Sequence, residues 1–76
     1  MLILYTKNNS KKCEDLKHAF EKRNLRYEER NVADKNFLKE AEELGATDMP
    51  FLFDPQANFK TGNVEDMIDY ASEYAF

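Results

Sequence analysis

The sequence predicts an α/β domain in which strands and helices follow one another in the order β-α-β-α-β-β-α. Three observations carry this prediction. The uninterrupted apolar run Met1–Tyr5 is typical of a strand that helices cover on both faces. Three later segments place apolar residues at helical spacings of three and four. Turn-forming residues separate these segments from shorter stretches that suit strands.

The first half of the chain predicts a βαβ unit. The first strand spans residues 1–6, and the first helix spans about residues 11–24 with Ser10 as its N-cap. Segment 25–32 is charged and alternates with a period of two, which favours an edge strand. The two strands should therefore be parallel, with a right-handed crossover. The inward-facing residues of the first helix are Cys13, Leu16, Ala19 and Phe20.

Two further helices are marked by capping residues. Asp34 is a good N-cap for a helix over about residues 35–44, and Gly45 stands where a C-terminal glycine belongs. Asn63 is an N-cap for a last helix over about residues 64–74, with acidic residues in its first turn. The expected apolar stripe of the earlier helix comprises Phe37, Leu38, Ala41 and Leu44.

Between these helices the sequence predicts a loop and a hairpin. Pro50 restricts the preceding Met49 to an extended conformation, so the two residues end the loop before the next strand. Short strands over residues 51–53 and 59–61 flank segment 54–58, whose Asp, Pro and Asn residues are typical of a turn. The second half of the domain is thus a helix, a hairpin and a closing helix.

Length and composition exclude several classes of protein. Seventy-six residues fit a single domain over residues 1–76, and we expect it to be a monomer. The net charge of −4 argues against non-specific nucleic-acid binding. The chain has no long apolar run and no signal-peptide core, so we expect a cytoplasmic protein without a membrane partner. With one cysteine and one histidine, it has neither an internal disulfide nor metal-ligand spacing.

Segment 7–13 joins the first strand to the first helix and holds the only cysteine, Cys13. Free N–H groups and the helix dipole favour negative charge at such a helix start. A thiolate would be stabilised there by the nearby positive charges. These charges belong to Lys7, Lys11, Lys12 and Lys17. The same lysines also suit an ordinary solvated helix face, and the sequence leaves both interpretations open.

Four features together resemble the glutaredoxin family over essentially the whole chain. They are Tyr5-Thr6-Lys7 at a strand end, Ser10-x-x-Cys13 at a helix start, Met49-Pro50 before a short strand, and segment 61–66 before the last helix. The resemblance implies a thioredoxin fold, with a four-stranded mixed sheet flanked by three helices. It also implies thiol–disulfide oxidoreductase activity on protein or small-molecule disulfides. Glutathione would be the co-substrate, without a tightly bound cofactor.

The resemblance also implies roles for single residues. Ser10 occupies the position of the attacking cysteine, and Cys13 occupies that of the resolving cysteine. Lys7 matches a lysine beside the thiolate and the glycine carboxylate of glutathione. Met49 matches the residue whose backbone pairs with glutathione, and Pro50 matches a cis-proline facing the active site. The motif that holds the γ-glutamyl end corresponds to Gly62, Asn63 and Asp66.

Ser10 is the decisive departure from the family pattern, because thiol–disulfide exchange requires a thiolate. A serine without an adjacent base is not a comparable nucleophile, so we expect little or no exchange activity from the chain with Ser10. Three explanations compete: replacement of a cysteine or selenocysteine, a natural serine in a redox-inactive binding module, and chemistry through Cys13 alone. Asp48 also departs, since the family usually has threonine there.

One related enzyme class also fits these features. It is the NrdH-redoxin, a glutaredoxin-like electron donor to ribonucleotide reductase that thioredoxin reductase recharges. The short chain and the spacing from Gly62 to Met67 suit that class too. The sequence therefore leaves the reductant open between glutathione and thioredoxin reductase.

Overall fold

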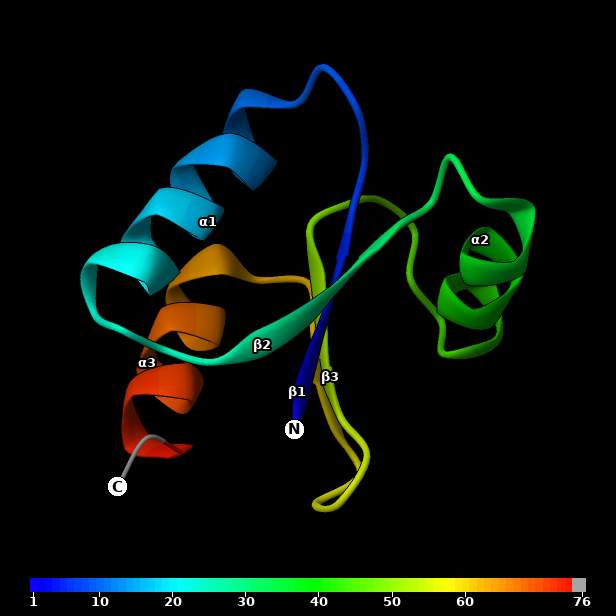
Figure 1. Cartoon of the computed structure of the whole chain (residues 1–76). Coiled ribbons are helices and arrows are strands. Elements are labelled where there is room, and N and C mark those ends of the chain that lie inside the picture. Colours follow the sequence, from blue (N-terminus) through cyan, green and yellow to red (C-terminus); the bar gives the residue numbers. More distant parts are fainter. Residues whose placement is uncertain (75–76) are drawn as a thin grey trace.

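A computed structural model describes residues 1–74, whose elements follow the expected order (Figure 1). These elements are β1 (Leu2–Thr6), α1 (Lys11–Lys22), β2 (Tyr27–Asn31), α2 (Lys35–Glu43), β3 (Phe51–Asp54), β4 (Phe59–Thr61) and α3 (Val64–Tyr74). Within the described residues, none of the helices combines the length and the apolar character that crossing a membrane requires.

The strands form one mixed sheet in the order β2-β1-β3-β4. Strand β1 pairs parallel with β2 and antiparallel with β3, and β4 pairs antiparallel with β3. Helices α1 and α3 lie on one face of the sheet and α2 lies on the other (Figure 1). The predicted α/β class, the mixed sheet and its three flanking helices are confirmed, in an arrangement compatible with a thioredoxin-like fold.

Strand β1 is buried along its whole length because helices cover both of its faces. Its even positions, Leu2 and Leu4, belong to the core beneath α1 and α3. Its odd positions, Ile3 and Tyr5, belong to the core on the α2 side. The core under α1 and α3 is completed by Leu16, Phe20, Leu25, Leu52, Met67 and Ala71.

Two details of the helices differ from the sequence prediction. Helix α1 ends at Lys22, and Asn24 is the left-handed residue beyond its end, with φ of 56°. Asparagine tolerates this conformation better than most residues, so Asn24 ends the helix as its sequence position allowed, although the last helical residue lies two positions earlier. Leu38 is 38% exposed, although the sequence predicts it on the apolar stripe of α2. It lies about 100° around the helix from Phe37, away from the sheet-facing residues.

The last residue of β3 is a buried carboxylate, which the sequence identified only as part of the following turn. Asp54 is 1% exposed and accepts hydrogen bonds from the Tyr70 hydroxyl at 2.5 Å and the Gln56 N–H at 3.0 Å. The Tyr70 ring stacks on Phe59, with ring centroids 4.2 Å apart. The Tyr70 hydrogen bond lowers the pKa of Asp54, and the same bond raises the pKa of Tyr70 to about 12.

Replacing this carboxylate should destabilise the domain measurably. We expect Asp54→Ala to lower the free energy of unfolding by about 2 kcal/mol, because two donors lose a charged acceptor. Asp54→Asn keeps an oxygen acceptor at the same place, so its effect should be clearly smaller. Urea unfolding followed by circular dichroism measures both values. Equal losses for the two variants would contradict the expectation that a neutral oxygen acceptor keeps part of this stabilisation.

The same group contributes to acid sensitivity. Because folding lowers the pKa of Asp54, its contribution to stability is fully present above the ordinary aspartate pKa of about 3.9. That contribution is lost as the pH falls through the lower pKa of the folded state. Asp54→Asn should therefore flatten the loss of stability below about pH 4, as urea unfolding at a series of acidic pH values would show. An unchanged acid profile would contradict this assignment.

Candidate functional site

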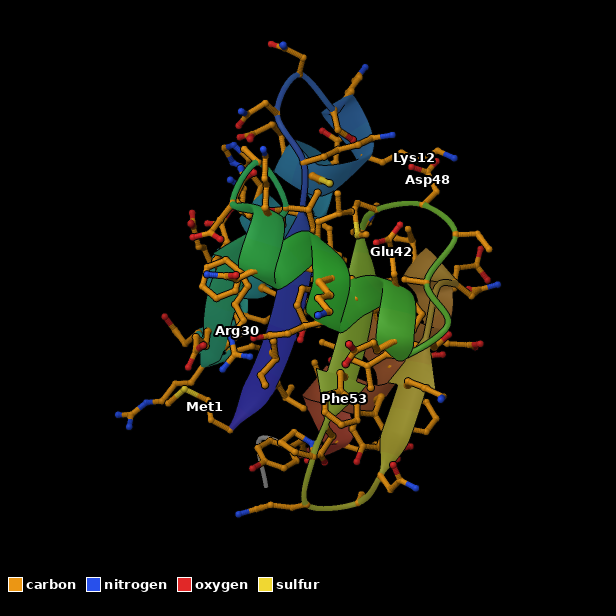
Figure 2. All side chains as sticks on the ribbon, turned by 90° about the vertical axis from the view of Figure 1, so that its right-hand side faces the viewer. Met1, Lys12, Arg30, Glu42, Asp48 and Phe53 are labelled. Atoms are coloured by element: carbon orange, nitrogen blue, oxygen red, sulfur yellow. The ribbon has the colours of Figure 1, made fainter. Side chains whose placement is uncertain are left out.

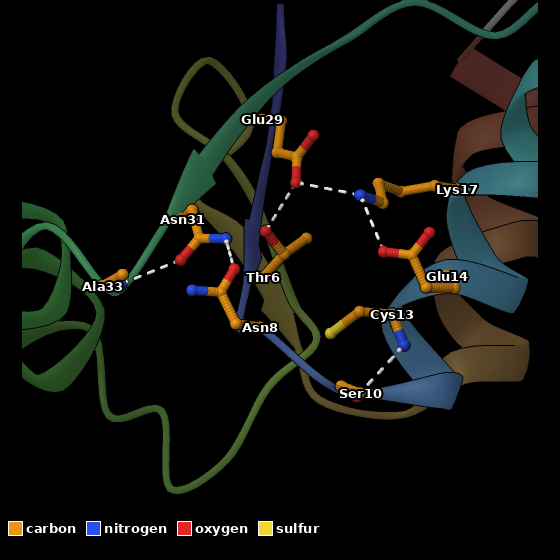
Figure 3. A network of polar contacts seen from close by, with 9 residues as sticks. All are labelled: Thr6, Asn8, Ser10, Cys13, Glu14, Lys17, Glu29, Asn31 and Ala33. Carbon is orange, nitrogen blue, oxygen red and sulfur yellow. Dashed lines mark hydrogen bonds and ion pairs between the residues drawn. The ribbon is translucent and has the colours of Figure 1, made fainter.

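The junction between β1 and α1 is fixed by side-chain hydrogen bonds (Figure 3). Ser10 has an extended backbone, with φ of −116° and ψ of 114°, and its Oγ accepts from the Cys13 N–H at 3.3 Å. Ser10 is therefore the N-cap that the sequence predicted. On the other side of the junction, the Asn31 side-chain amide donates to Asn8 Oδ1 at 2.9 Å. This bond ties the junction to the end of β2.

Cys13 is fully buried, which agrees with the inward-facing position that the sequence predicted. Only 1% of the residue is exposed, and its side chain points from α1 toward β1 (Figure 3). It shares a buried cluster with Tyr5, Met49 and Phe51. Helix α1 therefore contributes one side chain to the core on the α2 side of the sheet. A thiol in such apolar surroundings is shielded from solvent and from reagents.

Part of the basic charge near Cys13 is balanced by carboxylates. Lys17 Nζ forms ion pairs with Glu14 at 3.1 Å and with Glu29 at 3.2 Å. Glu29 Oε2 also accepts from the buried Thr6 hydroxyl at 2.7 Å (Figure 3). Lys17 therefore links α1 to β2 through its ion pair with Glu29. Of the nearby positive charges that could stabilise a thiolate, the charge of Lys17 is thus already paired with carboxylates.

A groove of about 330 Å³ lies beside the start of α1. We call it the proline groove, and its walls include Lys12, Asp48, Met49, Pro50, Phe51 and Gly62. Three of these residues, Met49, Pro50 and Gly62, were predicted as site residues. The Met49–Pro50 peptide bond is cis, as the resemblance implied. The groove thus brings together residues from three separate segments of the chain.

Other groove residues carried weaker sequence signals. In the sequence, Lys12 is one of several lysines near Cys13, and in the structure it lines the groove. Thr47, in the loop before β3, and Val64, the first residue of α3, also line the groove. Their positions depend on how the loops before β3 and after β4 approach each other. Charge near the cysteine was therefore the only sequence signal that could have identified one of these residues.

The remaining predicted site residues do not line the groove. Asn63 is the N-cap of α3 and accepts from the Asp66 N–H at 3.1 Å, and both residues are exposed. Asn63 stands between Gly62 and Val64, which line the groove. In the segment from Ser10 to Cys13, the residue that lines the groove is Lys12. Among residues 1–74, no three His, Cys, Asp or Glu side chains are grouped to hold a metal ion.

Lys7 contacts a carboxylate of the protein itself. Its Nζ lies 2.7 Å from Asp48 Oδ1, and the side chains are 42% and 72% exposed. The hydrogen bond to Asp48 raises the pKa of Lys7, and the hydrogen bond from Lys7 lowers the pKa of Asp48. Both groups are therefore charged at neutral pH. Lys7, which the resemblance places beside a ligand carboxylate, thus forms an ion pair with Asp48 of the same chain.

A comparison with protein-family models, curated proteins and solved structures found no match to this chain. The site itself is the basis for a functional assignment. It combines a helix start, which favours negative charge, with a groove of mixed polarity and two lysines nearby.

Proposed function

We propose that this domain is a glutaredoxin-like scaffold for thiol–disulfide exchange, with residue 10 as the attacking position. The observation that carries the proposal is the convergence of three segments on the proline groove. The start of α1 contributes Lys12, the loop before β3 contributes Met49 and Pro50, and the turn after β4 contributes Gly62. The resemblance assigned the same three segments to one active site.

With a thiolate at position 10, the reaction would proceed in two exchange steps. The thiolate attacks the glutathione sulfur of a mixed disulfide, and the substrate leaves as a thiol after taking up a proton. The thiolate of a second glutathione then attacks the new disulfide at position 10. Oxidised glutathione forms and the thiolate is regenerated, so each turnover consumes one free glutathione, which pairs with the glutathione taken from the mixed disulfide.

The chain with Ser10 should bind such ligands without turning them over. The Ser10 hydroxyl accepts a hydrogen bond from the Cys13 N–H as a helix cap. His18, the only histidine, is exposed on the outer side of α1, in a hollow that Asp15 and Lys22 also line. A hydroxyl without a base that takes its proton is a weak nucleophile.

The test is the Ser10→Cys variant, assayed for reduction of a small glutathione mixed disulfide. Turnover with glutathione supports the proposal, and a folded variant without turnover overturns it. Turnover only with thioredoxin reductase as the reductant would favour the NrdH-redoxin class instead. The genomic codon for residue 10 adds a separate check, because a serine codon supports a natural binding module. A cysteine codon or UGA supports the enzyme.

A further inference from the structure

One carboxylate oxygen at the proline groove accepts two hydrogen bonds from the protein. Asp48 Oδ1 accepts from Lys7 Nζ at 2.7 Å and from the Met49 N–H at 2.8 Å. Asp48 belongs to the loop before β3, and Lys7 belongs to the junction before α1, 41 residues away in sequence. Asp48 lines the groove, and its side chain is 72% exposed. The carboxylate therefore lies at the groove surface, where a ligand would meet it.

A second lysine adds to the positive charge at this place. Lys12 also lines the groove, and Figure 2 shows it near Asp48. The Lys7 hydrogen bond is the main cause of the lowered pKa of Asp48, and the charge of Lys12 contributes to it. Asp48 is therefore ionised at neutral pH. Two ammonium groups and one backbone N–H would suit a bound anion, and Asp48 provides that anion from within the chain.

We infer that Asp48 determines ligand specificity, because its carboxylate occupies the place in the groove where an anion would bind. This place, which we call the anion-binding corner, lies between Lys7, Lys12 and the Met49 N–H. This inference rests on the proposed function. A ligand with a free carboxylate at this corner must displace Asp48 from Lys7 or lie beside a like charge. A ligand with an uncharged group there meets no such competition. The groove should therefore favour disulfides within a polypeptide, where the backbone continues as neutral amides, over free glutathione.

The expected effect is moderate, because the pair is exposed and water screens both charges. Asp48→Asn is the sharpest substitution. The amide oxygen can still accept from the Met49 N–H, so the loop keeps its local hydrogen bond while the charge is removed. The matched control is Glu73→Gln, which removes one negative charge from an exposed position near the end of α3. That position is nine residues beyond the groove residue Val64, or about 13 Å along the helix.

The experiment measures binding of two reduced ligands to the chain with Ser10 by NMR titration. One ligand is glutathione, and the other is its glycine ethyl ester, which lacks the glycine carboxylate. We expect Asp48→Asn to tighten glutathione binding about threefold to tenfold at low salt, with a smaller gain at high salt. Binding of the ester should change less than twofold or so. Glu73→Gln should leave the ratio of the two affinities unchanged.

Each outcome decides the inference. An unchanged or weaker affinity of Asp48→Asn for glutathione overturns it, and so does an equal gain for both ligands. If Ser10→Cys turns over with glutathione in those cases, the proposed function stands and only the role of Asp48 is rejected. If no variant binds either ligand and Ser10→Cys is folded but inactive, both proposals fail together.

Discussion

The Ser10→Cys variant is expected to reduce a glutathione mixed disulfide at least ~10³-fold faster than the chain with Ser10. Cysteines at helix N-termini have pKa values of about 3.5–7.5, so an introduced thiol would have a substantial thiolate fraction at neutral pH. At position 10 the new sulfur would replace an oxygen that accepts from the Cys13 N–H, and that donor would stabilise a thiolate. The exchange rate depends on the thiolate fraction, which a serine does not supply.

Two control variants separate the chemistry from the loss of the helix cap. Ser10→Ala removes the same Oγ without adding a thiol, and it should cost about 1 kcal/mol of stability without any turnover. Cys13→Ser in the Ser10→Cys background tests the supporting residue. With a small glutathione mixed disulfide it should retain most of the turnover, because a second glutathione resolves the intermediate. Turnover in Ser10→Ala would show that the activity does not come from position 10.

The fold was predictable because short-range signals agree with the global arrangement. Continuous apolar character in β1 predicted a strand buried on both faces, and the caps Ser10, Asp34 and Asn63 predicted the helix starts. Gly45, with φ of 91°, ends α2 as its position indicated. Each of these features depends on residues within one turn of helix or one strand. Periodicity and capping therefore contain the information that fixes them.

The site was less predictable because its contacts join residues that are far apart in sequence. The ion pair between Lys7 and Asp48 spans 41 residues, and nothing in either local segment indicates it. The depth of Cys13 also depends on tertiary packing, because Met49 and Phe51 approach it from the loop before β3 and from β3 itself. Spacing placed Cys13 on the inner side of α1, but spacing contains no information about what covers that side.

Cys13 is expected to resist alkylation in the folded chain. With 1% of the residue exposed, iodoacetamide can reach the sulfur only when the start of α1 opens. Local opening costs less than global unfolding, which for a domain of this size requires about 4–11 kcal/mol at 0.05–0.15 kcal/mol per residue. We therefore expect labelling to be at least ~10²-fold slower in native buffer than in concentrated urea. Mass spectrometry of quenched samples measures both rates.

The matched control places an exposed thiol in the same helical turn. Lys11→Cys combined with Cys13→Ser moves the thiol two residues toward the N-terminus, to an exposed position. Its labelling rates in buffer and in urea should differ by less than about tenfold, because no opening step is needed. If Cys13 itself labels in buffer at the rate of this control, its thiol is accessible to substrates. Chemistry through Cys13 alone would then become the better explanation of a site that carries serine at position 10.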